Sequence, residues 1–73
     1  MPSYRVVIEQ DEDGVFCASV PALPGCFSSG DTHEEAVANV REAMSLHLDV
    51  LREHNDPIPA SRPVTVEDVD VAV

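Results

Sequence analysis

The chain has 73 residues, and its 14 acidic and 4 basic side chains give a net charge of −10 at pH 7. This length is enough for one small domain, over residues 1–73, which buries only about 60% of the surface that the unfolded chain exposes. Direct nucleic-acid binding is disfavoured, because it depends on clustered lysine and arginine. The chain has no lysine, and its four arginines are scattered: Arg5, Arg41, Arg52 and Arg62.

No signal peptide or membrane-spanning segment is expected. The N-terminus lacks the apolar core of a signal peptide, and no apolar run approaches the ~20 residues that cross a bilayer. We therefore expect a cytoplasmic protein in which Cys17 and Cys26 stay reduced. With no disulfide or metal to stabilise so small a scaffold, we also expect a homo-oligomer, a dimer or tetramer.

Two strands joined by a polar hairpin are predicted at the start of the chain. Residues 4–9 and 15–20 are rich in β-branched side chains, and residues 10–14 form a polar connector, acidic at 11–13, that ends in glycine. Side chains alternate across a strand. The residues that share the core face are therefore Tyr4, Val6 and Ile8 in the first strand, and Phe16, Ala18 and Val20 in the second.

A proline-braced turn follows the second strand. Pro21 and Pro24 lack a backbone donor and fit no central strand, so the chain leaves the sheet near Val20. Gly25 accepts a positive φ and completes the turn. Residues 26–28 are expected to form a short third strand, and Gly30 and Asp31 are expected to break the extended conformation after it.

A capping box marks the start of a helix. Thr32 is a suitable N-cap, and Glu35 follows it by three residues. This spacing predicts that the Thr32 hydroxyl accepts from the Glu35 amide while the Glu35 carboxylate accepts from the Thr32 amide.

The helix is predicted over residues 33–54 and ends before Pro57. Its apolar stripe has helical spacing and should cover the sheet: Val37, Val40, Met44, Leu48 and Leu51. A second apolar set lies beside it: Ala36, Ala43, Leu46 and Val50. Either Leu46 and Val50 face another subunit or a partner, or they complete a broad core face.

The C-terminal region predicts a last strand. Residues 57–63 form a proline-stiffened crossing, and alternation resumes over 64–66 and again over 69–73. The alternation slips at 67–68, which either a bulge or a kinked edge strand would explain. Val69 and Val71 could also pair with the edge of another chain. The predicted order is therefore β-β-β-α-β, an α+β fold with one long helix on one face of a small, largely antiparallel sheet.

No residue pattern supports catalysis or a cofactor. The acidic connector at residues 11–13 has no converging carboxylates from other elements, which a metal nuclease requires. His47 and His54 lie seven residues apart, too far for shared ligation of a metal. Cys17 and Cys26 are expected to be buried apolar side chains without an activating base. We therefore expect no catalytic, cofactor-binding or metal-binding residues.

Taken together, the segments resemble the N-terminal domain of HicB-like antitoxins. The matching segments are Tyr4–Glu9, Asp11–Gly14, Val20–Cys26, Gly30–Ala36 and Ile58–Pro59. The positions that carry this signature are Pro21, Pro24, Gly25, Gly30, Thr32 and Glu35, each of which also has a structural reason to be present.

The resemblance implies a partial, degenerate ribonuclease-H-like fold and a non-enzymatic function. Members of this family neutralise HicA toxins, which are small basic ribonucleases that cleave messenger RNA. Many also carry a C-terminal DNA-binding domain, and we expect none here. A stand-alone structural or regulatory homo-oligomer is the alternative function, and a residual metal-dependent nuclease is a remote one. The interface residues we expect are Leu46, Val50, Val69 and Val71.

Overall fold

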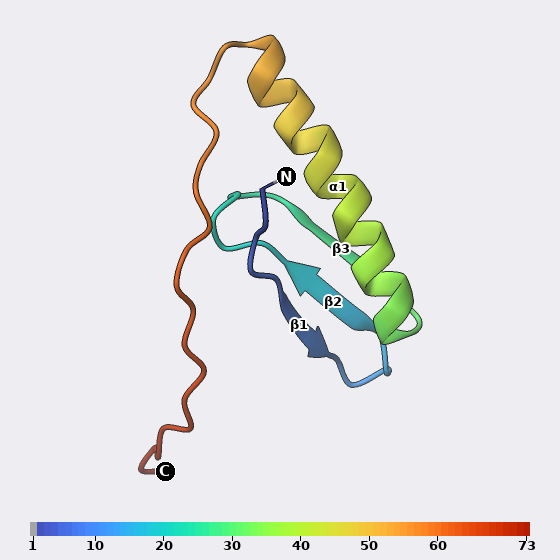
Figure 1. Cartoon of the computed structure of the whole chain (residues 1–73). Helices are drawn as coiled ribbons and strands as arrows, with labels where there is room; N and C mark the ends of the chain where they lie inside the picture. Colours follow the sequence, from blue (N-terminus) through green and yellow to red (C-terminus); the bar gives the residue numbers. More distant parts are fainter. Residues whose placement is uncertain (1) are drawn as a thin grey trace.

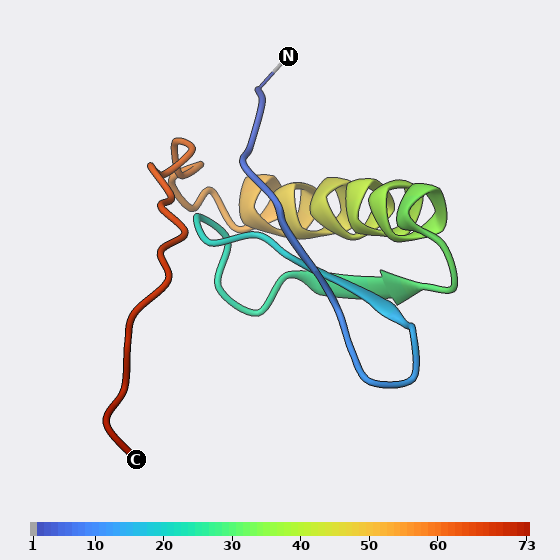
Figure 2. The same cartoon turned by 90° about the horizontal axis from the view of Figure 1, so that it is seen from below.

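The computed structural model describes residues 2–73 and shows an antiparallel meander followed by a single long helix. The strands are β1 (Val7–Gln10), β2 (Phe16–Ser19) and β3 (Phe27–Gly30), and the helix is α1 (His33–Glu53). β2 lies between β1 and β3, so the outer edge of each of these two strands is free within the described chain. The helix covers one face of the sheet, mainly over β3 and β2 (Figures 1 and 2).

The pairing register confirms the predicted alternation. Ile8 lies opposite Ala18, and Ala18 lies opposite Ser28, on the strands to either side. Ala18 is buried, whereas its neighbours Cys17 and Ser19 are exposed. The first two strands are shorter than predicted, and the third begins and ends later, at Phe27 and Gly30.

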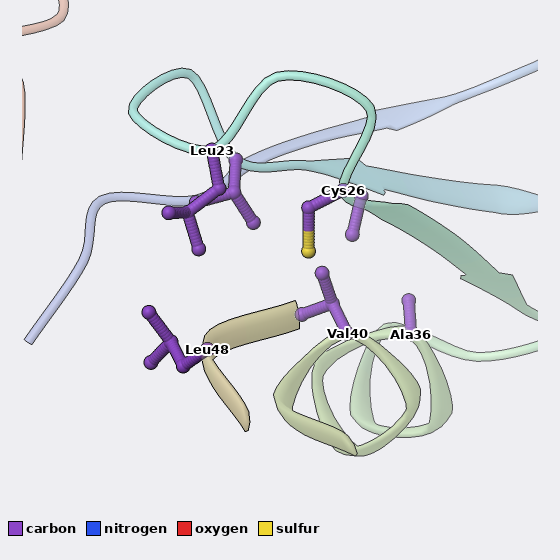
Figure 3. Close-up of a cluster of buried hydrophobic side chains, with 7 residues drawn as sticks. Leu23, Cys26, Ala36, Val40 and Leu48 are labelled. Atoms are coloured by element: carbon purple, nitrogen blue, oxygen red, sulfur yellow. The ribbon is translucent and has the colours of Figure 1, made fainter. Parts of the chain in front are cut away.

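The core is formed by β2, the turn that follows it, and α1 (Figure 3). Its buried members are Ala18, Val20, Leu23, Cys26, Ala36, Val40 and Leu48. Leu23 and Val40 are its largest fully buried side chains. No polar or charged side chain is buried anywhere in residues 2–73, so this core serves packing alone.

The turn between β2 and β3 is held by its own backbone. The Leu23 amide donates to the Val20 carbonyl at 3.0 Å, and the Cys26 amide donates to the Leu23 carbonyl at 3.0 Å. The Val20 amide also donates to the Cys26 carbonyl across the turn, and Gly25 has the positive φ of +82° that the sequence predicts. These bonds aim Leu23 into the core, so the turn is a structural part of the domain.

The helix start is confirmed except for one hydrogen bond. The Glu35 amide donates to the Thr32 hydroxyl at 3.1 Å, as expected of an N-cap. The Glu35 carboxylate, however, accepts from the Asp31 amide at 2.9 Å, so the prediction that it would accept from the Thr32 amide is wrong. The exposed side chain reaches one residue further back and still satisfies a free backbone donor ahead of the helix.

The predicted last strand is absent from the described chain. Residues 57–73 follow α1 as an extended segment without sheet pairing and lead away from the body in both views (Figures 1 and 2). The start of this segment is anchored: the Tyr4 hydroxyl donates to the Pro59 carbonyl, and the Arg5 amide donates to the Ser61 hydroxyl at 3.0 Å. The predicted β-β-β-α-β order is thus realised only as β-β-β-α, and the likeness to a ribonuclease-H-like fold stays a prediction.

Candidate functional site

One end of α1 forms an apolar groove with the start of β3, which we call the α1–β3 groove. Its volume is about 370 Å³. The side chains that form its apolar walls are Cys26, Phe27, Ala43, Leu46, Val50 and Leu51. The sequence singled out Leu46 and Val50 as a possible interface, and the fold brings these two together in this groove.

Three large apolar side chains of the α1–β3 groove remain open to solvent. Phe27 is 71% exposed, Leu46 62% and Val50 49%. The broad core face considered for Leu46 and Val50 is therefore not formed in the described chain. An apolar cluster of this kind, on so small a domain, is typical of a surface that binds another molecule.

Phe27 is a groove residue that was not among the predicted interface residues. Strand alternation gave the available signal: Cys26 points inward to the core, so the next side chain must point to the opposite face. Phe27 therefore lines the edge of the groove from the outer face of the sheet, where it also borders Cys17 and Ser19. An aromatic side chain in this position offers a large apolar area for contact.

Acidic side chains flank the helical side of the α1–β3 groove. Glu42 precedes Leu46 by four residues and Glu53 follows Val50 by three, so each lies next to an exposed apolar residue on the helix surface. Both carboxylates are exposed. The groove therefore presents an apolar centre with negative charge beside it.

The other two predicted interface residues lie elsewhere. Val69 and Val71 are on the extended C-terminal segment, each 75% exposed. Figure 1 shows this segment on the β1 side of the molecule, away from α1. The fold of one chain thus places the four predicted residues on two separate surfaces.

The acidic connector has a structural function in the hairpin. The Asp11 carboxylate accepts from the Asp13 amide at 2.9 Å and from the Val15 amide at 3.0 Å. These bonds close the turn between β1 and β2. Within residues 2–73, no group of three or more histidine, cysteine or carboxylate side chains is placed to hold a metal ion.

The two cysteines occupy different environments, and one prediction for them is wrong. Cys26 is buried, as expected, but Cys17 is exposed because it lies on the outer face of the central strand. Burial raises the pKa of the Cys26 thiol, since the charged thiolate is poorly solvated there.

We expect the two thiols to react at very different rates. In native protein at pH 8, Cys17 should be alkylated by iodoacetamide within minutes, whereas Cys26 should react only in denaturant, because the thiolate is the reactive form and needs access. Mass spectrometry of the modified peptides measures both rates. Equal rates in native protein would contradict the burial of Cys26. Cys17→Ser is the control, because Cys26 is then the one thiol left to react.

The described chain contains no helix long and apolar enough to cross a membrane. Its fold and surface define a small α+β domain with an exposed apolar groove next to acidic side chains. A family model described as "HicB_like antitoxin of bacterial toxin-antitoxin system" matches residues 4–71. The chain therefore belongs to the HicB-like antitoxin family.

Both short and longer curated relatives match the chain. A UPF0150 protein of Thermoplasma acidophilum is 48% identical over 56 residues, which cover 77% of this chain and 81% of that protein. A UPF0150 protein of Synechocystis is 42% identical over 57 residues, covering 78% and 72%. Antitoxin HicB 1 of Photorhabdus laumondii is 35% identical over 68 residues, and the match spans 93% of this chain but only 44% of that longer protein.

Proposed function

We propose that this protein binds and neutralises a small basic toxin that cleaves messenger RNA, of the HicA kind. The single observation that carries the proposal is the match of residues 4–71 to the HicB-like antitoxin family. Such a function is non-enzymatic and requires no cofactor or metal. It would be performed in the cytoplasm, where the messenger RNA is.

The charge of the chain supports a basic protein as the partner. A net charge of −10 on 73 residues creates a field that attracts a cationic protein and speeds their encounter. The same field repels RNA. The acidic protein would therefore exclude RNA from the toxin instead of binding to the toxin together with RNA. This attraction should weaken as salt rises, because exposed charges are screened over about 8 Å at physiological ionic strength.

The α1–β3 groove is the surface that we assign to the toxin. Phe27, Leu46 and Val50 supply an exposed apolar centre, and Glu42 and Glu53 supply negative charge next to it. Interfaces combine an apolar centre with a polar rim, and a few aromatic or aliphatic anchors contribute most of the affinity. Contact by this surface would cover the toxin and block access of RNA.

A charge placed in the groove should weaken neutralisation. We expect Leu46→Lys to weaken binding of the toxin at least tenfold, because it removes an apolar anchor and places a cation against a basic partner; tenfold corresponds to about 1.4 kcal/mol. Ala38→Lys is the matched control, since it adds the same charge at another exposed position of α1 outside the groove. Calorimetry with a small basic HicA-type protein, taken from the gene neighbourhood if one is encoded there, together with an RNA cleavage assay, gives the measurement.

Three results would count against the proposal. Cleavage that continues at full rate in excess wild-type protein would reject neutralisation. Equal weakening by both lysine variants would assign binding to charge alone and reject the groove. Cleavage of RNA by this protein itself with magnesium or manganese, lost in Asp11→Ala or Glu9→Ala, would favour the nuclease alternative.

A stand-alone homo-oligomer without a toxin is the second candidate function. It is favoured by the short UPF0150 relatives, of which this chain covers most of the length. A gene neighbourhood without a small basic open reading frame, together with no toxin recovered by pull-down, would support this alternative.

A further inference from the structure

The C-terminal segment, residues 57–73, forms no helix or strand in the described chain. The radius of gyration is 14.2 Å, whereas a compact domain of this length has about 11 Å. The segment accounts for the excess, since it extends from the body in both views (Figures 1 and 2). Val66 is 87% exposed, and Val69 and Val71 are 75% exposed.

Nevertheless, the segment has the pattern of a strand. Val69, Val71 and Val73 alternate with Asp70 and Ala72, so an extended conformation puts the three valines on one side. Unpaired apolar strands of this kind attract other strands and are normally covered in the native assembly. This segment therefore requires a sheet edge with an apolar space beside it.

A second groove, between α1 and the β1 side of the sheet, provides such a place. We call it the β1-side groove; its volume is about 540 Å³. The apolar side chains that line it and are only partly buried are Tyr4, Val6, Val37 and Met44. On the sheet side the groove is formed by Tyr4 and Val6, just before β1, and the outer edge of β1 is unpaired in residues 2–73. A strand added along that edge would therefore lie beside the groove.

Charge also favours this groove for the C-terminal segment. Arg41, Arg52 and Asp49 line the β1-side groove and are exposed, so its lining carries a net positive charge of one. Among the described residues, Arg52 makes a weak surface contact with Asp49 at 3.5 Å, and Arg41 makes no ion pair. The C-terminal segment carries Glu67, Asp68 and Asp70. The α1–β3 groove, in contrast, has glutamates beside it and would repel this segment.

The segment is held so that it leaves its own domain. Its start is fixed beside Tyr4 and Arg5 by the bonds to Pro59 and Ser61, just before β1 begins. Beyond Ser61 the chain diverges from β1 in both views (Figures 1 and 2). Residues 64–73 span about 33 Å at 3.3 Å per residue, long enough to reach a second copy and run along a four-residue strand.

We propose that two copies of this chain exchange their C-terminal segments. Residues 69–73 of each copy pair with the free edge of β1 of the other, and Val69, Val71 and Val73 fill its β1-side groove. The arrangement is reciprocal, because each copy provides one segment and one groove, as a two-fold dimer requires. It leaves the α1–β3 groove of both copies open.

Two adjacent substitutions test the exchange. Val71→Asp puts a charge on the side that faces the groove and should raise the dimer dissociation constant at least tenfold. It replaces an apolar contact with a desolvated carboxylate, and an exposed ion pair with Arg41 or Arg52 would return little of that cost. Ala72→Asp adds the same charge on the opposite side and should leave the dimer intact. Sedimentation equilibrium of each full-length protein from 1 to 100 μM measures this, and circular dichroism checks that α1 is retained.

Isotope-filtered NMR then locates the segment. In a dimer mixed from ¹³C-labelled and unlabelled wild-type chains, we expect intermolecular contacts from the Val71 methyls to the Met44 methyl and Val37. A wild-type monomer, equal effects of the two aspartates, or contacts only within one chain would overturn the proposal. Contacts to Phe27 or Leu46, or none from Val71 within a dimer, would overturn it as well.

Discussion

Replacing Gly30 with alanine is expected to destabilise the domain by about 3 kcal/mol, the upper part of the usual range for overpacking. A Cβ at this position would lie 2.6 Å from the Ala36 amide nitrogen and 2.7 Å from the Glu35 Cβ. These atoms belong to the first turn of α1, which packs directly on β3, so neither can move without shifting the helix. Ala36 is fully buried, and the shift would therefore reach the core.

Gly25→Ala is the matched control for Gly30→Ala. A Cβ on Gly25 would meet nothing within 4 Å, but φ is +82°, so the cost is conformational and about 1 kcal/mol. Urea denaturation followed by circular dichroism, at one fixed protein concentration, gives the two free energies of unfolding. If Gly30→Ala cost no more than Gly25→Ala, the close approach of β3 to α1 would be refuted.

The second large effect is expected at Leu23, in the turn between β2 and β3. Leu23→Ala should lower the free energy of unfolding by about 3 kcal/mol, because it removes a fully buried side chain and leaves a cavity among its neighbours. A domain of this size has about 4–11 kcal/mol in total, so the loss is a large fraction. The variant should unfold at a clearly lower urea concentration.

Leu46→Ala provides the same chemical change on the surface. Leu46 is exposed in the α1–β3 groove, so its truncation should change the free energy of unfolding by no more than about 0.5 kcal/mol. The difference between the two leucines separates a core residue from a candidate binding residue. A large loss at Leu46 would mean that another copy covers it under the conditions of the measurement.

Local signals in the sequence were sufficient for most of the secondary structure. The Thr32 cap predicted the start of α1 at His33, and the Asn55 to Pro57 region predicted its end, where Asn55 indeed has a φ of +55°. Alternation placed Ala18 and Val20 on the core face of the second strand. These predictions succeed because caps, turns and side-chain alternation depend on residues within a few positions of one another.

Which side chains are buried and which are exposed depends on packing between distant elements. Local signals in the sequence could therefore not predict it. Leu23 looked like part of a turn motif, yet the turn folds it into the core; Cys17 looked like a buried residue, yet the outer face of the sheet is left uncovered. The exposure of Phe27 also follows only from which face α1 covers. Each of these outcomes depends on an element distant in sequence.

The sequence by itself determined the three-stranded meander and its turns, the long helix, the net charge and the family to which the chain belongs. Only the tertiary structure decided which apolar side chains stay exposed, because α1 can cover one face of the sheet and cannot also bury Leu46 and Val50 on its flank. It also decided that the last strand is not formed within the chain. A strand needs an adjacent edge to pair with, and alternating valines in the sequence do not specify whose edge that is.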